Sequence, residues 1–219
     1  METGFLVAIC LLRLGVMLMA VSVILLDIGG VIVALTGVKR LIELLGNKIT
    51  PDELTRRWIA SKYVTLFETG QCDAQVFSSG VIDELHMDIT SRAFIDEFRL
   101  FTKGFYKGAT GLLKQIHPRF MLACLSNTNA IQWESLRDRI GIHAYFQHCF
   151  LSYEIGVLKP DSAAYEHAIQ ALACQPEDIA FFDDNANNIR AAKQMGMCAY
   201  QVVGVEQLRN ALNDLHFLS

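Results

Sequence analysis

Five short apolar runs, rich in β-branched and aromatic residues, are spaced along the chain, and each ends in turn-forming or polar residues. They are residues 21–27, 119–126, 148–152, 179–183 and 197–203. Amphipathic helical patterns separate the last four runs. Strands that alternate with helices predict a parallel sheet, because each crossover helix packs back on a face of that sheet. We therefore expect an α/β fold with a Rossmann-like, three-layer parallel sheet core.

A long stretch with helical periodicity and no convincing strand separates the first run from the second. Its helical patterns cover Val38–Leu45, Pro51–Phe67, Ala74–Leu85 and Thr90–Phe101. Thr50 and Pro51 begin one of these helices as N-cap and first residue. The stretch is too long for an ordinary crossover. We expect residues 37–106 to form an inserted helical cap domain on a core made of residues 19–36 and 107–219.

The N-terminal part is the most apolar segment, from residue 5 to residue 26, and is long enough to span a membrane. However, the residues before it are acidic rather than basic, and its last part is needed as the first strand. We interpret residues 1–18 as a dispensable leader or a mis-called start, with Met19 as the natural start. An extra packed helix, or an anchor or signal peptide, are the alternatives.

Composition narrows the possible partners. The formal net charge is −4 and the pI is about 5.8, without a run of Lys or Arg, which argues against nucleic acid and anionic membranes as partners. The six cysteines are widely spaced without a CxxC pair, as is typical of reduced thiols in a cytoplasmic protein. The six histidines form no zinc-binding pattern. The oligomeric state is not readable from the sequence.

The residues that end the apolar runs are the candidates for chemistry, because open parallel sheets bind ligands beyond the carboxyl ends of their strands. Asp27 ends the first run, Ser126 the second, and Asp183 with Asp184 the fourth, while Lys159 follows the third after a short loop. This order would bring a carboxylate nucleophile, a hydroxyl group, an ammonium group and a pair of acids to one edge of the sheet.

Each motif has an ordinary interpretation when it is taken alone. Asp27 precedes a pair of glycines that allow a tight turn, so it presents its carboxylate for attack or only caps that turn. Ser126 and Asn127 can bind phosphoryl oxygens or only begin a helix. Lys159, held extended by the proline after it, can neutralise phosphate charge or only lie on the surface.

Asp183 and Asp184 form the most informative pair. Two adjacent carboxylates repel each other unless a cation lies nearby. Oxygen ligands that leave sites for water and phosphate suit Mg²⁺ better than zinc or calcium. The ordinary alternative is a solvated loop before a helix.

Taken together, the four motifs in this order resemble the haloacid dehalogenase superfamily over residues 21–205. The helical insert resembles that superfamily's cap between the first two motifs. The residues 125–129 (Leu-Ser-Asn-Thr-Asn), the residues 181–188 (Phe-Phe-Asp-Asp-Asn-Ala-Asn-Asn) and the Asp-x-Gly-Gly form of the first motif resemble the branch of bacterial sugar-phosphate phosphatases such as α-glucose-1-phosphatase.

The resemblance implies a mechanism. Asp27 would attack phosphorus and form an aspartyl-phosphate, which water hydrolyses. Asp27, the carbonyl of Gly29 and Asp184 would hold Mg²⁺, and Asp183 would hydrogen-bond a water on that metal. The phosphoryl oxygens would be bound by Ser126, Asn127 and Lys159, and Asn127 would also support that loop. The substrate would be a small phosphorylated metabolite, with a sugar phosphate favoured.

Gly29 departs from the pattern of the superfamily. Most of its phosphatases have a second aspartate at this position, which protonates the leaving alcohol and activates water. Such acid–base help is typically worth about 10²–10⁴ in rate. Three outcomes stay open: a slow phosphatase, one in which Asp183, a cap residue or the substrate supplies the proton, or a relative that only binds a phosphorylated ligand. Dehalogenation of a 2-haloacid, which needs no metal, is less favoured.

Substrate specificity is expected in residues 37–106 and just after Ser126, because the cap closes over the site in such enzymes. The side chains that we single out as candidates for substrate contacts are Arg56, Arg57, Trp58, Glu68, His86 and Trp133. Each also has an ordinary structural interpretation as solvated helix face, core or helix end.

Overall fold

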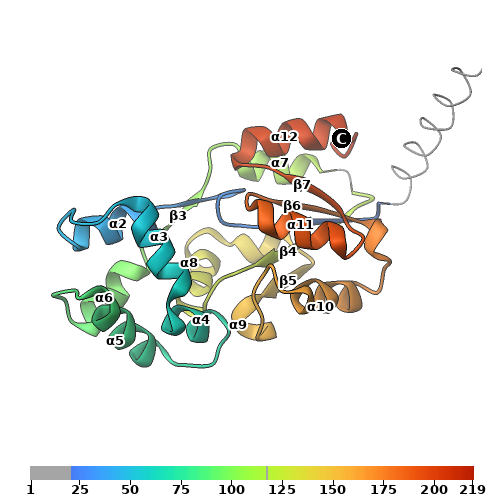
Figure 1. Cartoon of the computed structure of the whole chain (residues 1–219). Coiled ribbons are helices and arrows are strands. Elements are labelled where there is room, and N and C mark those ends of the chain that lie inside the picture. Colours follow the sequence, from blue (N-terminus) through green and yellow to red (C-terminus); the bar gives the residue numbers. More distant parts are fainter. Residues whose placement is uncertain (1–20, 117) are drawn as a thin grey trace, which may run out of the picture.

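The computed structural model describes residues 21–116 and 118–219, and its core is a five-stranded parallel sheet in the order β5-β4-β1-β6-β7 (Figure 1). The strands are β1 (Val23–Leu26), β4 (Met121–Ser126), β5 (His148–Leu151), β6 (Ile179–Asp183) and β7 (Cys198–Gln201). The five predicted strands and the parallel sheet are confirmed. The leader of residues 1–18, and the start proposed at Met19, lie outside the described residues.

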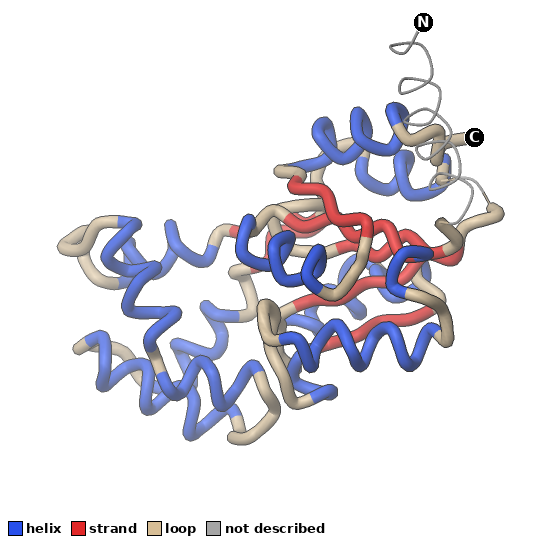
Figure 2. The backbone as a smooth tube through the Cα atoms, turned by 45° about the vertical axis from the view of Figure 1, so that its right-hand side comes forward, coloured by secondary structure: helices blue, strands red, loops and turns tan. Residues whose placement is uncertain are grey.

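Helices cover both faces of this sheet, so its central strands are buried on both sides (Figure 2). One face packs against α7 (Ala109–Gln115), α8 (Ala130–Ile140) and α12 (Gly204–Asp214), and the other against α10 (Ser162–Leu172) and α11 (Ala186–Gln194). Burial on both faces explains why the strands are continuous apolar runs rather than alternating ones. The predicted three-layer core is confirmed.

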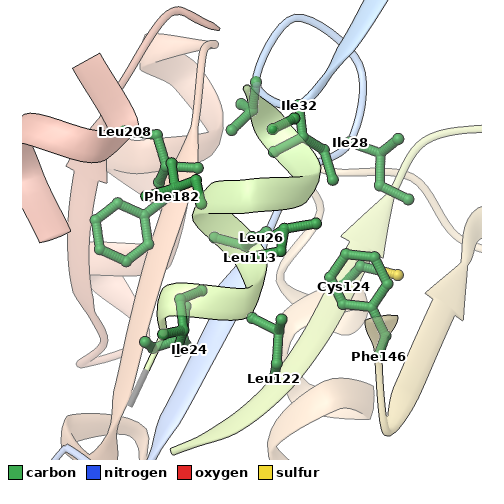
Figure 3. Close-up of a cluster of buried hydrophobic side chains, with 14 of the residues drawn as sticks. Ile24, Leu26, Ile28, Ile32, Leu113, Leu122, Cys124, Phe146, Phe182 and Leu208 are labelled. Atoms are coloured by element: carbon green, nitrogen blue, oxygen red, sulfur yellow. The ribbon is translucent and has the colours of Figure 1, made fainter. Parts of the chain in front are cut away.

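Strand β1 shows how the two faces divide its side chains. Ile24 and Leu26 point to the cluster that contains Leu113 of α7 and Leu208 of α12 (Figure 3). The alternate residues of the strand belong to the cluster on the opposite face. All four residues of β1 are almost completely buried, which leaves Asp27 as the first polar side chain at the end of a rigid strand.

The insert between the first two strands of the sheet is helical, as predicted, and lies beside the sheet in Figure 1. Its helices are α2 (Gly37–Leu44), α3 (Pro51–Ala60), α4 (Lys62–Glu68), α5 (Ala74–Leu85) and α6 (Ser91–Phe98). They share a hydrophobic cluster that is rich in phenylalanine and also contains Ile131 of α8. This cluster gives the cap its own core and joins it to the sheet domain.

One helix predicted in the cap is two helices in the structure. The pattern from Pro51 to Phe67 is interrupted at Ser61, which ends α3 and is the N-cap of α4. Its backbone is extended (φ −68°, ψ 124°), and its hydroxyl accepts a hydrogen bond from the backbone N–H of Val64 at 3.3 Å. A serine competes with the helix for backbone hydrogen bonds, so it can begin a new helix inside a periodic pattern.

The expectation of no strand between residues 37 and 106 was wrong. Strand β3 (Thr102–Phe105) pairs antiparallel with β2 (Val33–Leu35), which continues from the turn after Asp27. Thr36 extends the pairing, because its N–H donates to the carbonyl of Phe101 at 2.8 Å. The two segments of the chain that connect the core to the cap are therefore paired with each other in this two-stranded ribbon. A four-residue strand that contains a glycine carries too little periodicity to be recognised in sequence.

The remaining helical turns are short. They are α9 (Ser152–Ile155) and the 3₁₀ turns at Ile142–Tyr145 and Pro176–Asp178. In the described part of the chain, every helix is either too short or too polar to cross a bilayer.

Replacement of Phe77 by Ala tests the core of the cap. The Phe77 side chain is 1% exposed and stacks on Phe67 at 4.3 Å between ring centroids, so its removal leaves a cavity. We expect Phe77→Ala to lower the free energy of unfolding by about 3–5 kcal/mol. Val76→Ala is the matched control, because Val76 is 46% exposed, and we expect a change within about 0.5 kcal/mol. Urea unfolding followed by tryptophan fluorescence measures both, and equal effects would contradict this packing.

Candidate active site

The carboxyl ends of three adjacent strands bring the sequence-predicted polar residues together. Strand β1 lies between β4 and β6, and Asp27 follows β1, while Ser126 ends β4 and Asp183 ends β6. The backbone N–H of Asp27 still donates to the carbonyl of Phe182 at 2.8 Å, so the residue continues the ladder of the sheet. All three side chains are buried. The ends of the three strands therefore position these side chains at one edge of the sheet.

The ammonium group of Lys159 joins two of these strand ends. Its Nζ lies 2.7 Å from Oδ1 of Asp27 and 2.7 Å from Oδ2 of Asp183. The side chains of Lys159 and Asp183 are 1% and 0% exposed, and that of Asp27 is 11% exposed. Charge-assisted hydrogen bonds of this length are the strong ones. One buried cation thus connects the proposed nucleophile to the acid pair.

Asn127 holds the backbone of Lys159 in place. Its Nδ2 donates to the carbonyl of Lys159 at 2.8 Å, and its Oδ1 accepts from the N–H of Lys159 at 2.8 Å. The hydroxyl of Ser152 fixes the neighbouring turn, because it accepts from the N–H of Thr128 and donates to the carbonyl of Thr128. The expected support of the loop by Asn127 is seen in these two hydrogen bonds, while its binding of phosphoryl oxygens stays a prediction.

Asp183 is enclosed by donors on every side. Besides Lys159, the N–H of Asn185 donates to its Oδ1 at 2.8 Å, and Nδ2 of Asn188 lies 3.0 Å from both of its oxygens. The four motifs alone indicate no role for Asn188. The sequence feature that points to Asn188 is its position, because an asparagine in the first turn of the helix after β6 can reach back to the end of that strand.

The electrostatics of this edge depend on burial and on the lysine. Burial raises the pKa of Asp27 to about 7, although the ammonium of Lys159 opposes that rise. Burial would lower the pKa of Lys159, but the carboxylates of Asp27 and Asp183 raise the pKa above its ordinary value. Lys159 therefore stays charged, and it favours the ionised form of Asp27, which is the form a nucleophile requires.

Asp184 lies against the glycine turn that follows β1. A Cβ atom placed on Gly30 would be 2.1 Å from Oδ2 of Asp184, and Gly30 has a left-handed backbone with φ +74°. Only glycine fits here. In the described residues no other side chain forms a hydrogen bond or salt bridge with the Asp184 carboxyl group, whose pKa is raised by burial and by the charge of Asp183 although Lys159 opposes that rise.

A cavity of about 240 Å³ opens beside this edge between core and cap. The core contributes Gly29, Ser126 and Asn127 to its lining. Most of the remaining walls are apolar side chains, namely Ile28, Val33, Leu35, Val38, Leu41, Leu54, Trp58, Phe101 and Leu136. Neither Lys nor Arg belongs to the lining given by the described residues. A ligand in this cavity would meet a largely uncharged surface.

Glu68 is the acidic residue of the cavity lining. It is the last residue of α4 and is half-buried, and burial raises the pKa of its carboxyl group to about 7. Trp58 also reaches this lining.

The four other predicted substrate residues lie elsewhere. Arg56 is exposed on α3 and pairs with Glu53, as does Arg57. His86 ends α5 on the outside of the cap with φ 52°, and Trp133 is buried in the core under α8. The structure therefore brings Glu68 to the core residues, but not the two arginines, His86 or Trp133.

Comparisons with known proteins agree with this geometry. The chain is 29% identical over 166 residues to (S)-2-haloacid dehalogenase 2 of a Pseudomonas species, covering 74% of this chain and 70% of that protein. It is 27% identical over 144 residues to the D-ribitol-5-phosphate phosphatase of Bacteroides thetaiotaomicron, covering 61% of this chain and 68% of that protein. Matches to three further relatives cover only 23% to 37% of those proteins.

The fold is shared with solved structures. A haloacid dehalogenase family enzyme from B. thetaiotaomicron, crystallised with magnesium and inorganic phosphate, superimposes with a TM-score of 0.70 at 21% identity, covering 83% of this chain and 93% of that one. The family model of haloacid dehalogenase-like hydrolases matches residues 21–196, which is most of the chain. The chain is thus a hydrolase that belongs to the haloacid dehalogenase-like family, as the four motifs indicated.

Proposed function

We propose that this hydrolase is a Mg²⁺-dependent phosphomonoesterase that works through an aspartyl-phosphate on Asp27. The observation that carries the proposal is the buried ammonium of Lys159, 2.7 Å from Oδ1 of Asp27, with Ser126 at the end of the neighbouring strand. Phosphatases of small phosphorylated metabolites among the relatives support the same reaction class.

The chemistry follows from these positions. A carboxylate oxygen of Asp27 attacks phosphorus as the bond to the leaving oxygen breaks, and water later releases inorganic phosphate. The ammonium of Lys159 and the hydroxyl of Ser126 bind the phosphoryl oxygens as negative charge develops on them. Asp183 holds the lysine from the far side, so the ammonium does not have to reorganise during the reaction.

The residues present fit a magnesium ion. Asp27 and Asp184 supply carboxylate oxygens and Gly29 a backbone carbonyl, which are the hard donors that Mg²⁺ prefers. Asp184 faces the glycine turn without a cationic partner in the described chain, as a metal ligand would. Among the described residues, no group of three or more His, Cys, Asp or Glu side chains is placed to hold a metal ion. The proposed coordination of Mg²⁺ therefore also needs the carbonyl of Gly29, the substrate and water. A bound Mg²⁺ would offset the charge of nucleophile and phosphate.

The cavity indicates the size and charge of the leaving group. Its volume of about 240 Å³ corresponds to about eight water molecules in the liquid. Its polar lining includes Thr55, Thr102 and Gln132 beside many apolar side chains, without a cation to bind a second anionic group. We therefore propose a phosphomonoester of a small uncharged alcohol, a class that includes the sugar phosphates expected from the sequence.

Dehalogenation is the second candidate, because one matched relative is a 2-haloacid dehalogenase. In that reaction the Asp27 carboxylate would attack carbon and displace a halide. Asp184 argues for the phosphatase, since burial and the neighbouring charge of Asp183 disfavour its ionised form, and a bound metal ion would offset that cost. Release of chloride from 2-chloropropionate would favour the dehalogenase instead. A protein that only binds phosphorylated ligands would release neither product.

Hydrolysis of p-nitrophenyl phosphate tests the proposed reaction. We expect turnover that requires added Mg²⁺ and that falls by at least about a thousandfold in Asp27→Asn, because the amide cannot attack phosphorus. Asp88→Asn, at an exposed position of the cap, is the matched control and should keep the rate of the wild type. Turnover by Asp27→Asn equal to that of the wild type would refute the proposed nucleophile.

Gly30→Ala tests the metal site. A methyl group at this position would collide with the Asp184 carboxylate on a backbone that disfavours alanine, so it should weaken Mg²⁺ binding at least about tenfold. Isothermal titration calorimetry with Mg²⁺ measures this directly. Gly111→Ala is the control, because its Cβ would meet nothing within 4 Å on the exposed side of α7. Unchanged Mg²⁺ affinity in Gly30→Ala would rule out Asp184 as a ligand.

A substrate panel tests the proposed leaving group. We expect butyl phosphate and monophosphates of sugar alcohols to react with kcat/KM at least about tenfold above phosphoglycerate and sugar bisphosphates, because an unpaired second anion in this cavity would lose its hydration. Phosphate release measures each rate. Preference for the doubly anionic substrates would contradict the proposal.

A further inference from the structure

The proposed reaction lacks a group for proton transfer on the core. Gly29 occupies the position beside the nucleophile and has no side chain. Departure of an aliphatic alkoxide needs a proton, and the water that attacks the aspartyl-phosphate must lose one. The inference below rests on the proposed phosphatase reaction and concerns the residue that supplies these transfers.

The other acids at the strand ends are already engaged. Asp183 accepts hydrogen bonds from Lys159, Asn185 and Asn188 and is completely buried, so neither of its oxygens faces a ligand. Asp184 lies on the glycine turn, where it serves as a proposed ligand of Mg²⁺. A proton donor for the leaving group therefore has to come from the cap.

Glu68 is the cap acid that the fold carries to the core. It ends α4, and the chain just after it docks on α9: a Cβ atom placed on Gly70 would be 2.2 Å from the carbonyl oxygen of Tyr153. Thr69 closes the helix end, because its hydroxyl donates to the carbonyl of Thr65 at 2.7 Å. Glu68 lines the same cavity as Gly29 and Ser126. Its position is thus held from both domains.

Three other glutamates of the cap helices have hydrogen-bond or ion-pair partners, and Glu68 differs from them in this respect. Glu53 pairs with two arginines, Glu84 accepts a hydrogen bond from Ser61, and Glu97 pairs with Arg40. In the described residues no hydrogen bond or ion pair reaches the Glu68 carboxyl group. A half-buried acid in a mostly apolar cavity without a counter-charge is poised to carry a proton rather than to stabilise the fold.

We propose that Glu68 is the general acid and base of the reaction and replaces the missing side chain at Gly29. As Asp27 forms its bond to phosphorus, the bond between phosphorus and the leaving oxygen breaks, and the Glu68 proton moves to that oxygen to give the alcohol. The resulting Glu68 carboxylate takes a proton from the water that attacks the aspartyl-phosphate. Inorganic phosphate leaves, and Asp27 and protonated Glu68 are restored.

The surroundings of Glu68 make both proton transfers accessible at neutral pH. Burial raises the pKa of its carboxyl group to about 7, close to the best value for a group that must give and take a proton. The charged groups of the elements packed around it are engaged with others: Arg56 and Arg57 of α3 with Glu53, Glu84 of α5 with Ser61, and Glu154 of α9 with Tyr153. Lys62 of α4 lies over the ring of Tyr63, and Asp83 of α5 is exposed.

Two substrates with different leaving groups test the proposal. We expect Glu68→Gln to lower kcat/KM for butyl phosphate by about 10²–10⁴-fold. With p-nitrophenyl phosphate, whose leaving group needs little protonation, the variant should give a burst of p-nitrophenolate stoichiometric with enzyme and then slow turnover, because the aspartyl-phosphate accumulates. Glu43→Gln, a cap variant at an exposed position whose carboxylate pairs with Lys39, should match the wild type in both assays.

Rescue distinguishes proton transfer from a structural role. The φ of Gly29 lies outside the left-handed region, and a Cβ atom there would meet only the end of the exposed Leu35 side chain at 3.0 Å, so a small shift of Leu35 would make room for a side chain. We expect Gly29→Asp added to Glu68→Gln to restore butyl phosphate turnover by at least about tenfold. In the wild type, kcat/KM for butyl phosphate should fall as the pH rises above about 7, and this fall should be absent in Glu68→Gln.

The outcomes separate this inference from the phosphatase itself. Equal losses on both substrates without burst or rescue, or an unchanged rate in Glu68→Gln, would overturn the role of Glu68 while the dependence on Asp27 still supports the phosphatase. A wild-type rate on p-nitrophenyl phosphate no higher than that of Asp27→Asn would overturn both. Since glutamine matches the shape of the neutral acid, we expect Glu68→Gln to fold, and circular dichroism checks this.

Discussion

The ammonium of Lys159 between the carboxylates of Asp27 and Asp183 is the interaction on which the active edge depends. It joins residues that are 132 and 24 positions apart in the chain and lies out of contact with solvent. A buried charge that loses its partner costs about 3–5 kcal/mol, so each member requires the others. Asn127 and Asn188 complete the set by fixing the lysine backbone and the far carboxylate. The folded core alone therefore orients the proposed nucleophile, and the ammonium of Lys159 favours its ionised form against the effect of burial.

The cap contributes a different physical environment. Its phenylalanine cluster makes it a packed unit, and the ribbon of β2 and β3 ties both of its chain crossings to the turn after the nucleophile. The cavity between cap and core is walled mainly by apolar side chains, which exclude water and strengthen the electrostatic interactions inside it. A small uncharged leaving group suits these walls, and the charged phosphoryl group suits the edge of the sheet.

The division of labour between the two domains follows from one glycine. In the proposed mechanism, Gly29 has no side chain, so the core would bind negative charge through Lys159, Ser126 and the metal ligands, while Glu68 on the cap would transfer the proton. Catalysis would then require the end of α4 to stay docked against α9, where Gly70 allows the close contact with Tyr153. Cap position and acid–base chemistry are coupled by this contact, so a displaced cap would leave a charged edge without a proton donor.

The sequence by itself determined the sheet, the helical insert and the residues at the strand ends. These depend on local signals, since a buried apolar run followed by Asp27, Ser126 or Asp183 places each side chain at the carboxyl edge wherever the strand lies. Only the tertiary structure decided what they contact. The pairing of β3 with β2, the break at Ser61, the clamp of Asn127 on Lys159, and the presence of Glu68 rather than Arg56 or His86 in the cavity all arise from long-range packing. A helix pattern shows which residues share a face, but not which face meets the core.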